Sequence, residues 1–192
     1  MPRLFAALEI PDDLAFELAQ LRGGLYGARW MQEEDMHLTL RFVGDVDDRL
    51  AEEIESELAG IRKPGFRVEL DALDWFGGDR PRAIVVKARP TPPLLALQAA
   101  VESAMRRLGA PPEPRKFTPH VTLARLKGAS VAGVAGYLSA RGYFRPCGFP
   151  AERFALFSAR AGVGGGPYVV ERAFPLLPAR PAALPAKPAL GA

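Results

Sequence analysis

The sequence contains only two histidines, and each begins a tetrapeptide of the same kind: HLTL at residues 37–40 and HVTL at residues 120–123. Because side chains alternate along a β-strand, His37 shares a face with Thr39, and His120 shares a face with Thr122. The leucines and the valine of these motifs point to the opposite face, toward a core. Two imidazoles that titrate near neutral pH and two hydroxyls would then be available to one site.

These four groups suit an in-line displacement at phosphorus. A neutral imidazole can accept a proton from the attacking water, while the other, protonated imidazole gives a proton to the departing sugar oxygen. The threonine hydroxyls would hold the non-bridging oxygens, and an arginine would neutralise their charge. Arg41 is at an even offset from His37 and should face the cleft. Arg125 is at an odd offset from His120, so strict alternation turns it away unless the strand has a bulge.

Each of these residues has a structural alternative. A histidine on a half-buried strand can simply be a satisfied structural residue, and threonine is a good strand former. Two matched motifs, with no third histidine in the chain, favour acid–base catalysis. A metal site is disfavoured, because two histidines without an evident carboxylate or thiol partner are an incomplete ligand set.

The elements around the motifs repeat an order of strand, helix, connector and motif strand. Leu4 and His37 are 33 residues apart, and Ala83 and His120 are 37 residues apart. We infer a duplicated lobe, in which two-fold symmetry makes the motif strands face each other across a cleft. Hydrophobic periodicity and turn residues predict the individual elements. The expected strands are 3–10, 36–43, 66–70, 83–88, 120–126, 153–158 and 168–174, and the expected helices begin near residues 11, 47, 91 and 130.

The composition is that of an ordinary soluble globular protein, with 48% hydrophobic and 24% charged residues. The net charge of +3 permits a polyanionic ligand without requiring one. The N-terminal apolar run is interrupted by acidic residues and Pro11, so we expect no signal peptide, no membrane span and a cytoplasmic location. The single cysteine, Cys147, is interpreted as a bystander.

Other features have mainly structural interpretations. Core packing is the favoured role of Trp30, Trp75, Phe42 and Phe117, with base stacking as the alternative. The glycine run at 162–166 lies between two predicted strands, which favours a flexible hairpin loop over a phosphate-binding loop. Residues 178–192 show no periodicity and are predicted to be a disordered tail behind a single bilobal domain at 1–177.

The paired His-x-Thr-x motifs resemble those of the 2H phosphoesterase superfamily. The segments RLFAAL at 3–8, HLTLRFVG at 37–44 and FTPHVTLAR at 117–125 are similar to those of the bacterial RNA 2′,3′-cyclic phosphodiesterases, once named 2′-5′ RNA ligases. The likeness extends from about Arg3 to Leu177. Either motif alone would be weak, but two copies with these flanking residues are specific.

This resemblance implies an α+β, bilobal duplicated fold with antiparallel sheets lining a central cleft and helices packed outside. It also implies hydrolysis of a terminal 2′,3′-cyclic phosphate, on RNA or nucleotides, to a 2′-phosphomonoester without metal or cofactor. His37 would be the proton donor and His120 the proton acceptor, with Thr39, Thr122, Arg125 and Arg41 as phosphate-binding candidates. The family tends to use the arginine after the second motif, which favours Arg125. We expect a monomer.

Two other functions stay open. Within the superfamily, the protein could cleave or form 2′-5′ linkages. From another class, a non-catalytic RNA-binding module could use the same basic cleft, with binding that depends steeply on salt. A pure binder has no need of matched histidine–threonine pairs, which favours the enzyme.

Overall fold

The computed structural model describes residues 3–159 and 167–179. Strands predominate, and each predicted helix is present. The elements, in chain order, are β1 (Arg3–Glu9), α1 (Asp12–Ala19), β2 (Ala28–Trp30), the short 3-10 helix η1 (Glu33–Asp35), β3 (His37–Asp45), α2 (Asp48–Ala59), β4 (Phe66–Phe76), β5 (Ala83–Ala88), α3 (Pro92–Arg107), β6 (His120–Leu126), α4 (Val131–Arg141), β7 (Cys147–Ala151), β8 (Arg153–Ala159) and β9 (Tyr168–Pro175).

All pairings between these strands are antiparallel, and they form one sheet in the order β7-β4-β5-β6-β3-β1-β8-β9, with β2 beside β6. The sheet narrows at its centre, where β3 and β6 are joined by the single residue pair Leu38–Val121. This seam separates two lobes, one with β1, β3, β8 and β9 and the other with β2, β4, β5, β6 and β7. The predicted α+β, bilobal antiparallel fold is confirmed.

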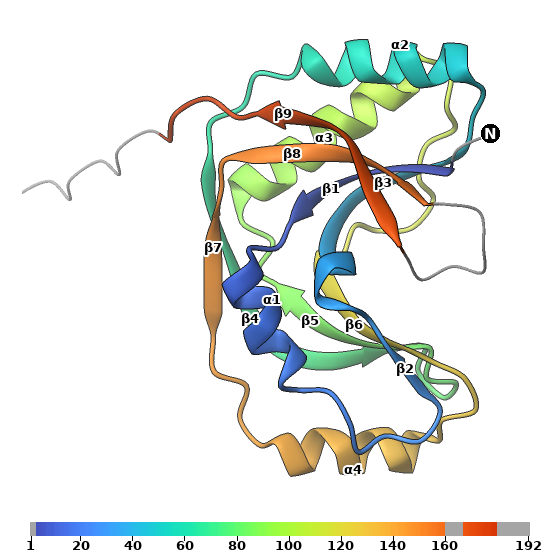
Figure 1. Ribbon diagram of the computed structural model, residues 1–192, viewed down its shortest axis with the longest axis vertical. Coiled ribbons are helices and arrows are strands. Elements are labelled where there is room, and N and C mark those ends of the chain that lie inside the picture. The colour runs from blue at the N-terminus through green and yellow to red at the C-terminus, as the bar shows by residue number, and fades with distance from the viewer. Residues whose placement is uncertain (1–2, 160–166, 180–192) are drawn as a thin grey trace, which may run out of the picture.

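The helices lie outside the strands, and the chain passes between the lobes several times. In Figure 1, α2 and α3 accompany β1, β3, β8 and β9, while α1 and α4 accompany the other lobe. The two helices of the second lobe are tied together, because the Tyr137 hydroxyl on α4 donates to the carbonyl of Leu21, just after α1, at 2.6 Å. The repeated units therefore exchange helices rather than forming two separate halves of the chain.

Strand β1 is buried on both of its faces. Leu4, Ala6 and Leu8 belong to the main core under the helices, whereas Phe5 and Ala7 belong to a smaller cluster on the other face. This double burial explains why the sequence of β1 is a continuous apolar run instead of an alternating one. The smaller cluster lies beside the histidine of β3, since Phe5 contacts the His37 ring at a centroid distance of 4.7 Å.

Most predicted elements are present within a few residues of their expected bounds, and the predicted β4–β5 hairpin forms. Two short strands, β2 and β7, were missed, and β4 continues to Phe76 instead of ending at Leu70. The predicted glycine-run loop at 162–166, and all of the predicted tail at 178–192 except its first two residues, lie outside the described residues. The domain boundary at Leu177 stays a prediction. In the part of the chain that the structure describes, no helix combines the length and apolar character needed to cross a membrane.

Candidate functional site

The two motif strands meet at the seam between the lobes. Leu38 and Val121, both fully buried, form the pair that joins β3 to β6. Neighbouring side chains on antiparallel strands alternate in face, so this register directs His37 toward Thr122 and His120 toward Thr39. The sequence prediction that the two motif strands face one another is therefore met by direct strand pairing across the seam.

Both imidazoles are oriented in the same way. The Nδ1 atom of His37 lies 2.8 Å from the carbonyl oxygen of Asp35, and the Nδ1 atom of His120 lies 2.7 Å from that of Thr118. A carbonyl only accepts hydrogen bonds, so each Nδ1 carries the proton and donates it. The Nε2 atom of each ring is left to exchange a proton with a bound molecule.

A β-bulge follows the threonine in each motif strand and corrects the parity argument for the arginines. In β3, Ala7 pairs with Thr39 and Ala6 with Arg41, which leaves Leu40 as the extra residue. In β6, Val85 pairs with Thr122 and Ile84 with Ala124, which leaves Leu123 as the extra residue. Each bulge inverts the alternation beyond it. The bulge in β6 is the condition under which Arg125 reaches the cleft face, and Arg125 lines the cavity described below. Arg41 also contributes to the lining of that cavity, but its side chain is only 9% exposed.

Arg41 is held by two carboxylates and two main-chain carbonyls of the protein itself. Its Nε lies 2.6 Å from Oε2 of Glu102 on α3, and its Nη1 lies 3.4 Å from Oε2 of Glu113. Nη1 and Nη2 also donate to the carbonyls of Phe42 and Pro111, each at 2.6 Å. With a side chain that is only 9% exposed, Arg41 fastens the connector between α3 and β6 to β3. Arg125, which is exposed, is therefore better placed than Arg41 to bind a phosphate, and both assignments stay predictions.

A cavity of about 490 Å³ opens over the motif strands. Of the predicted site residues, Thr39, Arg41, His120, Thr122 and Arg125 line it, whereas His37 does not. It is rich in basic and aromatic groups, because its other lining residues include Phe42, Phe76, Arg82, Arg115, Lys116 and Phe117. Arg125 is exposed there, and no carboxylate within the described ranges lies at ion-pair distance from it. The cavity is thus suited to an anionic ligand with an aromatic part.

Burial lowers the pKa of both histidines. For His37, burial is the largest cause and brings the pKa to about 4, with smaller contributions from the charges of His120 and Arg125 and an opposing one from the Asp35 carbonyl. For His120, burial lowers the pKa and the Thr118 carbonyl opposes it. The influence of His120 and Arg125 on His37 shows that the three groups lie within electrostatic reach of one another.

Aromatic rings surround each imidazole. His37 contacts Phe5 at 4.7 Å, Tyr168 at 5.0 Å and Phe157 at 5.9 Å between centroids. The Phe76 ring meets His120 edge-on at 4.7 Å between centroids. These rings exclude water from the imidazoles, which is the physical origin of the lowered pKa values.

The four aromatic residues singled out from the sequence divide into two pairs. Trp30 and Trp75 are partly buried against the main core, as predicted. Phe42, which is 48% exposed, and Phe117 line the cavity. Phe42 is five residues after His37, as Arg125 is five residues after His120, so the two occupy equivalent positions in the repeat.

Sequence reasoning did not identify several cavity residues. Phe76 and Arg82 flank the turn between β4 and β5, and Arg115 and Lys116 belong to the connector before β6. The only signals were the turn residues at 77–81 and the prolines of the connector, which predict loops without indicating which surface those loops reach.

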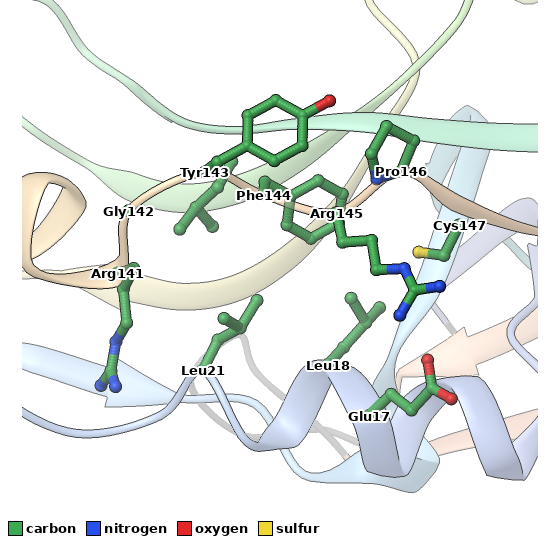
Figure 2. A pocket seen from close by; sticks show the side chains of 11 residues that line it. Glu17, Leu18, Leu21, Arg141, Gly142, Tyr143, Phe144, Arg145, Pro146 and Cys147 are labelled. Carbon is green, nitrogen blue, oxygen red and sulfur yellow. The ribbon is translucent and has the colours of Figure 1, made fainter.

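A second cavity, of about 440 Å³, lies away from the histidines, between α1 and the segment that links α4 to β7. Figure 2 shows Leu18 of α1 and Leu21, just after this helix, facing Tyr143 and Phe144 across it. Cys147 also lines this cavity, and burial raises the pKa of its thiol. No group of three or more histidine, cysteine or acidic side chains that could hold a metal ion occurs among residues 3–159 and 167–179.

Comparison with known proteins identifies the family. The family model of the 2′-5′ RNA ligase superfamily matches residues 10–162. The chain belongs to this superfamily. The chain is 43% identical over 101 residues to the RNA 2′,3′-cyclic phosphodiesterase of Aeropyrum pernix. This alignment covers 52% of this chain and 57% of the relative. It is 34% identical over 129 residues to the Escherichia coli protein of the same name. This alignment covers 64% of this chain and 71% of the relative.

The fold is shared across this superfamily. The crystal structure of Escherichia coli LigT complexed with 3′-AMP superposes with a TM-score of 0.73 at 25% sequence identity, covering 92% of this chain and 99% of that one. The alignment with the Aeropyrum pernix relative spans little more than half of that protein's length. The resemblance inferred from the two motifs is confirmed at the level of family and fold.

Proposed function

We propose that this protein hydrolyses terminal 2′,3′-cyclic phosphates on RNA or nucleotides to 2′-phosphomonoesters. The observation that carries the proposal is the direct pairing of the two motif strands, which brings the two imidazoles to one seam, each held through Nδ1. His120 lines the basic cavity at this seam. The relatives named RNA 2′,3′-cyclic phosphodiesterase support it, as does the nucleotide complex of LigT.

The reaction uses both imidazoles once per turnover. Nε2 of His120, in its neutral form, accepts a proton from the attacking water as the water oxygen bonds to phosphorus. The bond from phosphorus to the 3′-oxygen breaks in line, and His37, protonated on Nε2, gives its proton to that oxygen. This division of roles follows the family resemblance. The hydroxyls of Thr39 and Thr122 donate to the non-bridging oxygens, and Arg125 offsets their negative charge in the transition state.

The test is to incubate the purified protein with adenosine 2′,3′-cyclic phosphate and to identify the product by ³¹P NMR against 2′-AMP and 3′-AMP. We expect 2′-AMP, formed equally well in the presence of a chelator. A second arm supplies RNA oligonucleotides with defined 5′-hydroxyl and cyclic phosphate ends. Joined products, or cleavage of 2′-5′ linkages alone, would instead support the ligase-type reaction.

The histidines provide the matching variants. We expect His37→Ala and His120→Ala each to lower kcat by several orders of magnitude, because each removes one of the two proton transfers. Binding of single-stranded RNA that depends steeply on salt, without turnover and unaffected by either substitution, would support the RNA-binding module instead. Full activity in either variant would contradict the two-histidine mechanism.

A further inference from the structure

Asp35 is a buried acidic residue that makes two separate contacts beside the site. It ends η1, two residues before His37, and is only 6% exposed. Its main-chain carbonyl accepts the hydrogen bond from Nδ1 of His37 at 2.8 Å. Its side-chain Oδ1 accepts the backbone N–H of Tyr168, the first residue of β9, at 2.9 Å. One residue thus joins the histidine to a strand that is 133 positions away in the sequence.

The Tyr168 ring lies against the imidazole that Asp35 orients. The two rings meet edge-on, with a centroid distance of 5.0 Å and an interplanar angle of 89°. Tyr168 also meets Phe5 edge-on at 5.1 Å, and Phe5 contacts the same imidazole at 4.7 Å. The first residue of β9 is therefore part of the wall that keeps water from His37.

The second half of the molecule lacks this arrangement. Thr118 holds His120 through its carbonyl, but its side chain makes no hydrogen bond within the described residues. The ring over His120 is Phe76 of β4, and β4 is tied through β5 to β6 itself. The ring over His37 comes from β9, an edge strand that is connected to β3 only through β8 and β1. The Asp35 carboxylate adds a direct link between β9 and the residues before His37.

We propose that Asp35 is a positioning residue for His37, whose carbonyl orients the imidazole and whose carboxylate holds Tyr168 against that ring. The catalytic consequence rests on the proposed function, in which His37 is the proton donor. The positioning itself can be measured without turnover.

The protein is well suited to this measurement because His37 and His120 are its only histidines. Their side-chain NMR signals report the pKa and the protonated nitrogen of each ring in the full chain. Charged groups facing His37 from β6 are His120 and Arg125, and both remain in the variants below.

Asp35→Ala keeps the carbonyl but removes the carboxylate that holds Tyr168. We expect the pKa of His37 to rise from about 4 toward the ordinary value of 6.5, because water regains access to the ring, while the pKa of His120 stays unchanged. Tyr168→Ala keeps the backbone N–H but removes the ring that the carboxylate holds in place, so it should give the same shift. The double variant should shift no further, because the carboxylate acts on His37 through that ring. Asp35→Asn retains an acceptor for Tyr168 and should restore the wild-type titration.

Glu171→Ala is the matched control. Glu171 also lies on β9 and accepts a hydrogen bond from Ser158 of β8, away from both histidines. Glu171→Ala should lower the stability of β9 and leave both histidine titrations unchanged.

In an active protein, Asp35→Ala and Tyr168→Ala should lower kcat roughly 10- to 100-fold with little change in KM, since a displaced catalytic group costs about this much.

An unchanged His37 titration in Asp35→Ala, or shifts that add in the double variant, overturns the proposal. If Asp35→Ala does not fold, Tyr168→Ala decides alone, and an unaltered His37 pKa in that variant is then the contradicting result. Failure of the proposed function has a different signature, namely a wild-type protein that shows these titrations but does not open the cyclic phosphate.

Discussion

At the scale of single residues, Arg41 and Arg125 have the same side chain but differ in burial and in their contacts. Arg41 is buried among carboxylates and carbonyls, whereas Arg125 is exposed at the cavity. Removing one partner of a buried ion pair leaves an uncompensated charge, which costs stability. Removing an exposed arginine costs little stability but takes away a charge that the transition state uses.

Arg125→Ala should therefore lower kcat by about 10²- to 10³-fold, as the loss of one transition-state donor does elsewhere, with an unaltered urea midpoint. Steady-state kinetics and urea unfolding on the same preparation check both parts. Arg49→Ala, which removes an exposed arginine paired with Glu53 on α2, is the control and should change neither. Near-normal kcat in Arg125→Ala would contradict its assigned role.

Arg41→Ala should behave in the opposite manner. Breaking this buried ion-pair network is expected to cost about 3–5 kcal/mol of folding free energy, measured by urea unfolding. Arg41→Lys should recover only part of the loss, because lysine cannot reproduce the planar fork that reaches two carboxylates and two carbonyls. A stable Arg41→Ala variant with a selective loss of substrate binding would instead support a direct phosphate contact.

The pH dependence of the reaction is also decided by single side chains. The free protein holds both histidines with lowered pKa values, that of His37 at about 4. The profile of kcat/KM reports the free enzyme, so both of its limbs should lie at lower pH than two ordinary imidazoles would give. Bound phosphate is negative and favours the imidazolium, so the limbs of kcat should move to higher pH. Initial rates across pH check this, and a kcat/KM optimum above pH 6.5 would contradict it.

At the scale of elements, the turn between β4 and β5 positions one wall of the cavity. Gly77 has φ +113°, and a Cβ built there would lie 2.2 Å from the carbonyl oxygen of Arg80. Only glycine fits this turn, which carries Phe76 to His120 and Arg82 to the cavity.

Gly77→Ala should therefore destabilise the protein by about 1–3 kcal/mol, the usual cost of a strained backbone position, and should also lower activity. Thermal unfolding and kinetics provide the measurement. Gly78→Ala is the control, because Gly78 also has a positive φ but nothing lies within 4 Å of its Cβ position. If the two variants lose equal stability and activity, the steric cause is excluded.

The elements also show what the sequence can and cannot predict. Helix α2 was predictable from the Asp47 cap, whose side chain accepts from the Leu50 N–H, and α3 from the prolines in its first turn. The two bulges could not be located, because nothing in the local pattern distinguishes Leu40 or Leu123 from other apolar residues. Without the positions of the bulges, strand parity alone favoured Arg41 over Arg125 for the cleft face.

Other parts of the site depend on contacts between distant segments. The histidines and threonines followed from the repeated motif, and their convergence followed from its symmetry. The contact of Asp35 with Tyr168 depends on where β9 ends up in the sheet, which no local periodicity encodes. Strands β2 and β7 have only three and five residues and lack an alternating pattern, so they were recognisable only by their pairing.

At the scale of the whole molecule, the chain crosses between the lobes repeatedly, so neither lobe is a continuous piece of sequence. Each lobe needs helices and strands from both halves of the chain. We expect one cooperative unfolding transition, with equal calorimetric and van't Hoff enthalpies, because no lobe can fold while the other is unfolded. Calorimetry with the full chain tests this, and two resolved transitions would show that the lobes are independent.

The single pair Leu38–Val121 between β3 and β6 allows ligand binding in the cleft to be measured without following the reaction. In the proposed complex, groups from both β3 and β6 bind one phosphate. The phosphate then adds a second connection between two strands that are paired at one residue pair. Under the proposed function, opening of that boundary requires release of the ligand, so we expect a bound 2′-nucleotide to slow deuterium uptake by the amides of both strands. The hydrogen–deuterium exchange rate of the amides near Leu38 and Val121 then measures the fraction of protein molecules that have ligand bound.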